Sequence, residues 1–163
     1  MMLNTESAMR RALVSGTLAG MASAAATALA GKKEIGSYAA PLNATSHILW
    51  GDVAAMQNRL SLKYTLTGFL LNHAAAIFWA AVYETFFGAR PGKPDSPLRP
   101  LAGSALVTAG AYLTDYYLVP RRFTPGFEKR LSGRSLATVF GVLALGLAAH
   151  DLIARSTSPS RSW

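Results

Sequence analysis

The feature that most constrains this chain is a set of four long apolar stretches with few charged side chains: residues 12–30, 64–87, 101–119 and 135–154. About 20 apolar residues in a helix cross the ~30 Å hydrocarbon core of a bilayer. Lipid offers no hydrogen bonds to the backbone, so a spanning segment has to be a helix or part of a closed barrel. We therefore expect an all-α polytopic membrane bundle of four transmembrane helices, forming a single domain over residues 1–155.

The overall composition agrees with a membrane protein. Hydrophobic residues make up 51% of the 163 residues and charged residues 15%, against about 25% charged residues in soluble domains. The net charge of +8 comes from Lys and Arg that cluster at the ends of the apolar stretches. Such residues anchor helices at the headgroups and attract anionic lipid, so we expect the lipid bilayer, and no nucleic acid, as the partner of these charges. The absence of cysteine excludes disulfides, thiolate metal sites and cysteine nucleophiles.

Two interpretations compete for residues 12–30. A signal peptide would have the basic start at Arg10 and Arg11, an apolar stretch and a small-residue cleavage site at residues 28–30. A packed transmembrane helix would carry small residues every fourth position, and this stretch has Gly16, Gly20, Ala24 and Ala28. Such a ridge lets another helix approach closely. We expect the helix to be retained; a mature chain beginning at Gly31 would identify a signal peptide instead.

Two of the connections predict short amphipathic helices in the membrane interface. In residues 43–60 the apolar positions form one helical stripe: Leu49, Val53, Met56 and Leu60. A re-entrant segment is the alternative there. In residues 122–131 the apolar positions are Phe123, Phe127 and Leu131, at a spacing of four. Both patterns are typical of a helix that lies in the interface plane with its apolar face toward lipid.

Other segments predict how the helices are joined and packed. Residues 88–100 are rich in Pro and Gly and predict a turn between antiparallel neighbours, and residues 156–163 predict a disordered basic tail. Glycines in the last two apolar stretches favour tight helix packing or a homo-oligomer: Gly103, Gly110, Gly141 and Gly146.

No motif for a familiar chemistry is present. The sequence has no GxxxxGK[ST], no GxGxxG after a strand, no HExxH and no GxSxG, so it encodes no familiar nucleotide, zincin or hydrolase site. The sequence leaves both cofactor and metal binding open. What remains is a set of ionisable residues in or near the apolar stretches, where a charge costs about 3 kcal/mol or more at mid-helix.

The ionisable residues fall into two tiers according to the expected topology. The first tier lies near one side of the membrane and contains His73, Asp115 and Asn72, with His47 and Asp52. Imidazole and carboxylate groups from different helices suit a proton relay or a metal site. The alternative is a pair of buried hydrogen bonds that fix helix packing. His73 and Asp115 are expected to meet, because antiparallel pairing brings them to similar depth.

The second tier lies near the opposite side and contains Glu84, His150 and Asp151. Their positions near helix ends indicate side chains that are solvated or extend to the headgroups. Trp79 and Tyr83 indicate packing or interface anchors rather than a binding site.

Three segments resemble a set of uncharacterised small inner-membrane proteins of proteobacteria: residues 43–52 (NATSHILWGD), His73 with residues 78–80 (FWA) and Glu84, and residues 120–128 (PRRFTPGFE). The layout is also distantly similar to the YagU-type inner-membrane family, which is linked to acid tolerance. The resemblance implies a multi-pass protein of the bacterial inner (cytoplasmic) membrane and transfers no catalytic residue.

The leading expectation for function is therefore a non-enzymatic membrane protein: an accessory, scaffold or stress-related subunit. A small proton-linked transporter or channel that uses an intramembrane His/Asp pair is the alternative, and a membrane metalloenzyme is third. A scaffold should have a packed interior and an apolar interface, whereas a transporter needs a watery path that joins both tiers.

Overall fold

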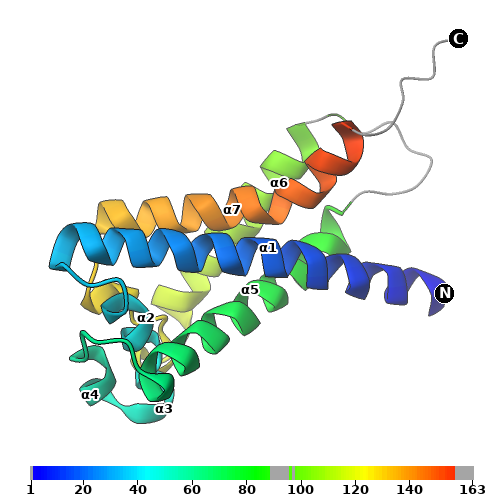
Figure 1. Ribbon diagram of the computed structural model, residues 1–163. Coiled ribbons are helices and arrows are strands. Elements are labelled where there is room, and N and C mark those ends of the chain that lie inside the picture. Colours follow the sequence, from blue (N-terminus) through cyan, green and yellow to red (C-terminus); the bar gives the residue numbers. More distant parts are fainter. Residues whose placement is uncertain (1, 89–95, 97, 157–163) are drawn as a thin grey trace, which may run out of the picture.

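The computed structural model is a bundle of long helices with a set of short turns at one end (Figure 1). It describes the backbone of residues 2–88, 96 and 98–156 and the side chains of residues 8–88, 96 and 98–154. The long helices are α1 (Met2–Ile35), α5 (Thr67–Phe86), α6 (Leu98–Leu113) and α7 (Gly133–Ser156). Within these residues there is no strand, so the all-α prediction is confirmed. Most of the predicted 88–100 turn and of the basic tail lies outside the described residues.

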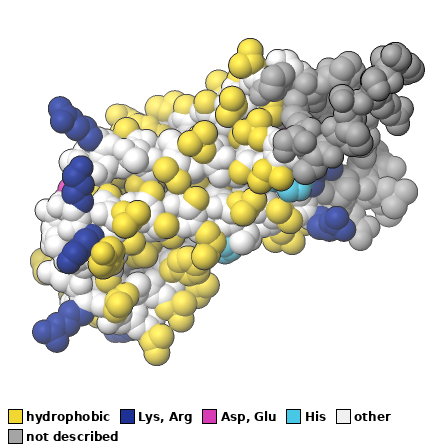
Figure 2. All heavy atoms as spheres, turned by 45° about the horizontal axis from the view of Figure 1, so that its top comes forward, with side chains coloured by type: hydrophobic (Ala, Val, Ile, Leu, Met, Phe, Trp, Pro, Cys, Tyr) yellow, Lys and Arg dark blue, Asp and Glu magenta, His cyan; other side chains and the backbone are white. Residues whose placement is uncertain are grey.

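Three helices are long and apolar enough to cross a membrane: Ala8–Ile35, Leu62–Phe86 and Gly133–Ala154, with 28, 25 and 22 residues. These are the candidate spans among the residues that the structure describes. By length and composition these three helices indicate a multi-pass membrane protein. The surface in Figure 2 agrees, since apolar side chains cover its length and Lys and Arg side chains gather at its ends. The third predicted span is not among the three. Helix α6 has 16 residues and continues into a π-helical turn, η2 (Thr114–Leu118), which holds Asp115.

Helix α1 is the centre of the bundle and packs along both α5 and α7. Its small residues allow this approach. A Cβ atom at Gly16 would lie 2.6 Å from Ile77 Cα, and one at Gly20 would lie 2.6 Å from His73 Nδ1, both on α5. On the other side, a Cβ atom at Gly146 of α7 would lie 2.5 Å from Ala19 Cα. Real contacts of this kind do not occur below 3.0 Å, so the glycines set the distance between these helices.

The prediction of one amphipathic helix over residues 43–60 is wrong. The chain forms three short helices instead: α2 (Ala40–Thr45), α3 (His47–Trp50) and α4 (Asp52–Ala55). Gly51 separates the last two at a φ of +70°, which ends helical continuity. Helix α2 is buried throughout, because Gly68 of α5 lies so close that a Cβ there would be 1.7 Å from the Leu42 carbonyl oxygen.

The predicted interfacial helix over residues 122–131 is also wrong. Two separate 3-10 turns replace it, η3 (Arg121–Phe123) and η4 (Phe127–Lys129), because Gly126 adopts a left-handed φ of +80° between them. Phe127 and Leu131 do not face lipid. They are buried in a small apolar cluster with Leu136 and Val139, while Phe123 is exposed.

The four glycines predicted to pack tightly behave in two ways. Gly103 lies against Phe87 and Gly146 against Ala19, each too close for a side chain. A Cβ atom at Gly110 or Gly141 would meet no atom within 4 Å. The first pair therefore serves the bundle itself, and the second pair faces outward.

The difference between these glycines predicts opposite effects of the same substitution. Gly146→Ala should lower the free energy of unfolding by about 1–3 kcal/mol, since the new methyl group would meet the α1 backbone. Gly110→Ala should leave it unchanged or raise it by up to about 1 kcal/mol, because alanine favours the helix and has free space. Unfolding of both variants in mixed detergent micelles measures this. Equal losses in the two variants would contradict the assignment of α1 as the tightly packed centre.

Candidate functional site

A buried ionic cluster joins the start of α1 to the end of α5. Glu84 is 4% exposed, and its carboxylate accepts two hydrogen bonds from α1: one from Arg11 Nε at 3.1 Å and one from Ser15 Oγ at 2.9 Å. Arg11 and Ser15 are one helical turn apart and so share a face of α1. The Arg11 side chain is 27% exposed and approaches Glu84 from the margin of the bundle.

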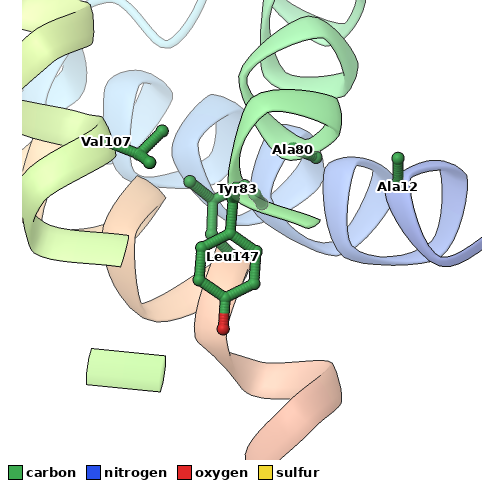
Figure 3. Close-up of a cluster of buried hydrophobic side chains, with 6 residues drawn as sticks. Ala12, Ala80, Tyr83, Val107 and Leu147 are labelled. Carbon is green, nitrogen blue, oxygen red and sulfur yellow. The ribbon is translucent and has the colours of Figure 1, made fainter. Parts of the chain in front are cut away.

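The end of α7 adds a second carboxylate to this cluster. Asp151 is 1% exposed and accepts a hydrogen bond from the Tyr83 hydroxyl at 2.9 Å. The Tyr83 ring stands among buried apolar side chains such as Leu147 and Val107, with its hydroxyl pointing away from them (Figure 3). Asp151 Oδ1 lies 3.8 Å from Nδ1 of its neighbour His150, whose side chain is 33% exposed. That nitrogen is buried and has no hydrogen-bond partner among the described residues.

The structure thus brings the three residues of the predicted second tier together. One ligand atom from each of Glu84, His150 and Asp151 lies within 4.8 Å of the other two. It is the single group of three or more His, Asp and Glu residues at metal-binding distance in the described part of the chain. The expectation of solvated side chains does not hold for the two carboxylates, because the close approach of α1 to α5 and α7 covers them.

Sequence reasoning missed three members of the cluster. Arg11 was expected to be a headgroup anchor, Tyr83 an interface or packing residue, and Ser15 was not singled out. A signal for two of them was present: Arg11 and Ser15 are four residues apart, and one step further along this face lies Ala19, which is fully buried.

The first tier is distributed over three places. His73 lies against Gly20, with its ring stacked on Phe69 at 5.6 Å between centroids, and its buried Nδ1 has no partner among the described groups. Asp115 and Asn72 both line a cavity of about 130 Å³. No ion pair between described residues joins His73 to Asp115, so the expected meeting of these two side chains is not seen.

The remaining two residues of the first tier serve local structure. His47 is buried, and its Nδ1 lies 2.8 Å from the Ala44 carbonyl oxygen. Asp52 is exposed and forms an ion pair with Lys129, and the hydrogen bond and charge of Lys129 lower the pKa of Asp52. The ion pair holds α4 to η4, whereas the His47 contact is local and joins α3 to the end of α2.

The cavity beside Asp115 is mostly apolar. Trp79, Phe123, Phe127 and Phe140 form much of its wall, and Asn72, Ser23, Thr45 and Asp115 contribute polar side chains. Asn72 also donates to Ser23 Oγ at 3.4 Å. The polar groups therefore sit in a small space between helices rather than in an open channel mouth.

A groove of about 550 Å³ runs between α6 and α7 on the outside of the bundle. Its walls consist largely of small residues: Ala105, Thr108, Ala109, Gly133, Ala137, Gly141 and Ala144. Thr108 is 6% exposed, and its hydroxyl oxygen is buried with no hydrogen-bond partner in the described structure. A buried hydroxyl without a partner is costly. The small lining residues leave room for another helix to approach the groove closely.

The Arg11–Glu84 contact predicts a measurable coupling energy. Arg11→Met and Glu84→Gln should each lower the free energy of unfolding. The loss in the double variant should be smaller than the sum of the two single losses by about 1 kcal/mol or more. The reason is that removal of one partner leaves the other buried and unpaired. Chemical unfolding in micelles measures all three variants.

The matched control is a second cycle in which Asp52→Asn replaces Glu84→Gln. Asp52 is exposed and pairs with Lys129 rather than with Arg11. The effect of Asp52→Asn should add to that of Arg11→Met within about 0.5 kcal/mol. Simple additivity in the Arg11–Glu84 cycle would show that the ion pair does not support the bundle.

A scan against protein-family models, a search of curated proteins and a search of solved structures each found no match. No function is therefore carried over from a relative. The site and the fold of the chain itself supply the argument for what the protein does.

Proposed function

We propose that the protein is a non-enzymatic subunit of a membrane assembly, in which the groove between α6 and α7 receives a second copy of the same chain. The observation that carries this proposal is the groove itself, which is lined largely by small residues and where a Cβ atom at Gly141 would meet no other atom of the chain within 4 Å. The proposal includes a fourth membrane crossing by α6 and a location in the bacterial inner membrane.

The outward side chains of α6 support its crossing. Leu106 is 66% exposed and Leu113 54%, whereas Ser104 is buried. Large apolar side chains facing outward and small polar ones facing inward are what a lipid-embedded helix requires. Helix α6 also packs along α7, which is apolar enough to span by itself.

The packing of the interior favours a subunit over the transporter alternative. Along α5, the cavity-lining residues Asn72 and Trp79 precede the apolar core residue Ala80, and Glu84 follows. Buried apolar side chains from all four long helices meet in that core: Ala12, Ala19, Ala80, Tyr83, Val107 and Leu147. This layer lies between the cavity at Asp115 and the ionic cluster, where a transport path would have to pass.

The margins of the groove suit a second copy of the chain. Leu113 lines it on α6, and Leu106 on α6 and Leu145 on α7 are further strongly exposed leucines on the two helices that form it. In a two-fold arrangement the same surface meets itself, so the leucines of one copy can fill the groove of the other. Small residues such as Gly141 then allow close backbone approach across the interface.

Association in lipid tests the proposal. Donor- and acceptor-labelled copies in liposomes should show energy transfer that falls as the lipid-to-protein ratio rises. Gly141→Leu fills the groove and should weaken the association at least tenfold, which corresponds to about 1.4 kcal/mol. Ala74→Leu, on an exposed position of α5 outside the groove, is the matched control and should associate like the original chain. Energy transfer no higher than expected from random encounter, or an equal effect of both variants, would contradict the proposal.

A further inference from the structure

The cluster at the ends of α5 and α7 has an excess of negative charge. Two buried carboxylates, Glu84 and Asp151, face one guanidinium, that of Arg11. The Tyr83 and Ser15 hydroxyls donate hydrogen bonds but carry no charge. Among the described residues, with both carboxylates ionised and the His150 imidazole neutral, one negative charge is left uncompensated, and a buried uncompensated charge is strongly unfavourable. The cluster therefore calls for a cation.

The atoms of the cluster that could bind a metal ion lie close to one another. Asp151 uses Oδ2 for the Tyr83 hydroxyl, while its Oδ1 faces His150 Nδ1 at 3.8 Å. That nitrogen is buried without a hydrogen-bond partner in the described structure, and one ligand atom from each of Glu84, His150 and Asp151 lies within 4.8 Å of the other two. Each carboxylate oxygen has two lone pairs, so Glu84 can keep its bonds to α1 and still bind a cation.

The geometry points to a site for a divalent transition-metal ion, bound by Glu84, His150 and Asp151. Metal–ligand bonds of about 2.0–2.2 Å place ligand atoms about 3–4 Å apart around one ion. The ligand atoms of the three residues lie within 4.8 Å of one another, so they would have to move closer by less than about 1 Å to bind one ion. One imidazole nitrogen with carboxylate oxygens suits Zn²⁺, Fe²⁺ or Mn²⁺ better than Ca²⁺, which takes oxygen ligands alone.

The neighbouring residues provide the support that metal ligands need. Ser15 and Arg11 orient the Glu84 carboxylate, and Tyr83 orients that of Asp151. Such outer hydrogen bonds fix metal-binding carboxylates in place. The His150 side chain is one-third exposed and gives an ion access from the end of the bundle. Arg11 opposes the metal by charge, so we expect moderate affinity.

The test uses the full chain, purified without a histidine tag and stripped with a chelator. Titration with Zn²⁺ should show one saturable site per chain, and Co²⁺ at the same site should give visible absorption bands of a nitrogen–oxygen ligand set. His150→Gln and Asp151→Asn should each weaken Zn²⁺ binding at least tenfold. His73→Gln and Asp115→Asn are the matched controls and should bind Zn²⁺ within about threefold of the original chain, with circular dichroism reporting the fold of every variant.

His150→Gln keeps the test decisive if Asp151→Asn fails to fold, because His150 is partly exposed and its Nδ1 has no hydrogen bond to lose. A folded chain with no saturable Zn²⁺ site would overturn the inference and leave protonation as the means of neutralising the cluster. Binding that survives in folded His150→Gln, or that falls equally in the His73 and Asp115 controls, would overturn it as well.

Discussion

The structure depends on the close approach of α1 to its two neighbours. Gly16 and Gly20 allow α5 to come near on one side, and Gly146 allows α7 to come near Ala19 on the other. In lipid, helices gain little from burying apolar surface, because lipid tails are as apolar as leucine, so association relies on close packing and interhelical hydrogen bonds. Without these glycines the backbone distances would increase, and both the core around Tyr83 and the ionic cluster would open.

The ionic cluster is the second consequence of that approach. Arg11, Ser15 and Glu84 can meet only because α1 and α5 lie so near each other, and Tyr83 then reaches Asp151 on α7. A buried ion pair often adds little net stability, yet breaking it is costly, so it favours one arrangement of the helices over others. The cluster thus fixes how α1, α5 and α7 are rotated about their axes, while the groove on α6 and α7 remains on the outside of the bundle.

Much of the helical framework could be predicted from the sequence. Long uncharged stretches define the helices, and the four-residue spacing of Gly16 and Gly20 marks a face that proves to contact α5. The meeting of Glu84 with His150 and Asp151 also followed from counting along antiparallel helices. These features depend on length and periodicity, which a sequence displays directly.

Other features depend on packing that no local pattern contains. Residues 43–60 have a helical stripe, but Gly51 and the burial of α2 beneath Gly68 break it into pieces. His73 and Asp115 were expected to meet because counting along the helices gives them a similar depth, yet the rotation of α5 turns His73 toward Gly20 of α1. Arg11 resembles a headgroup anchor until the position of Glu84 is known. Depth follows from sequence position, whereas rotation about a helix axis follows from the neighbours.

The central claim is the proposed bundle of four crossings with α1 at its centre. It is tested most directly by the sides of the membrane on which the helix ends lie. The chain has no cysteine, so single cysteines can be placed near the ends of α1 and α7 and labelled with an impermeant maleimide in sealed vesicles of one orientation. Met9→Cys and Ser156→Cys should label from one side, and Lys33→Cys and Lys129→Cys from the other. Positions 33 and 129 on opposite sides would show that α6 does not cross, and would contradict the account.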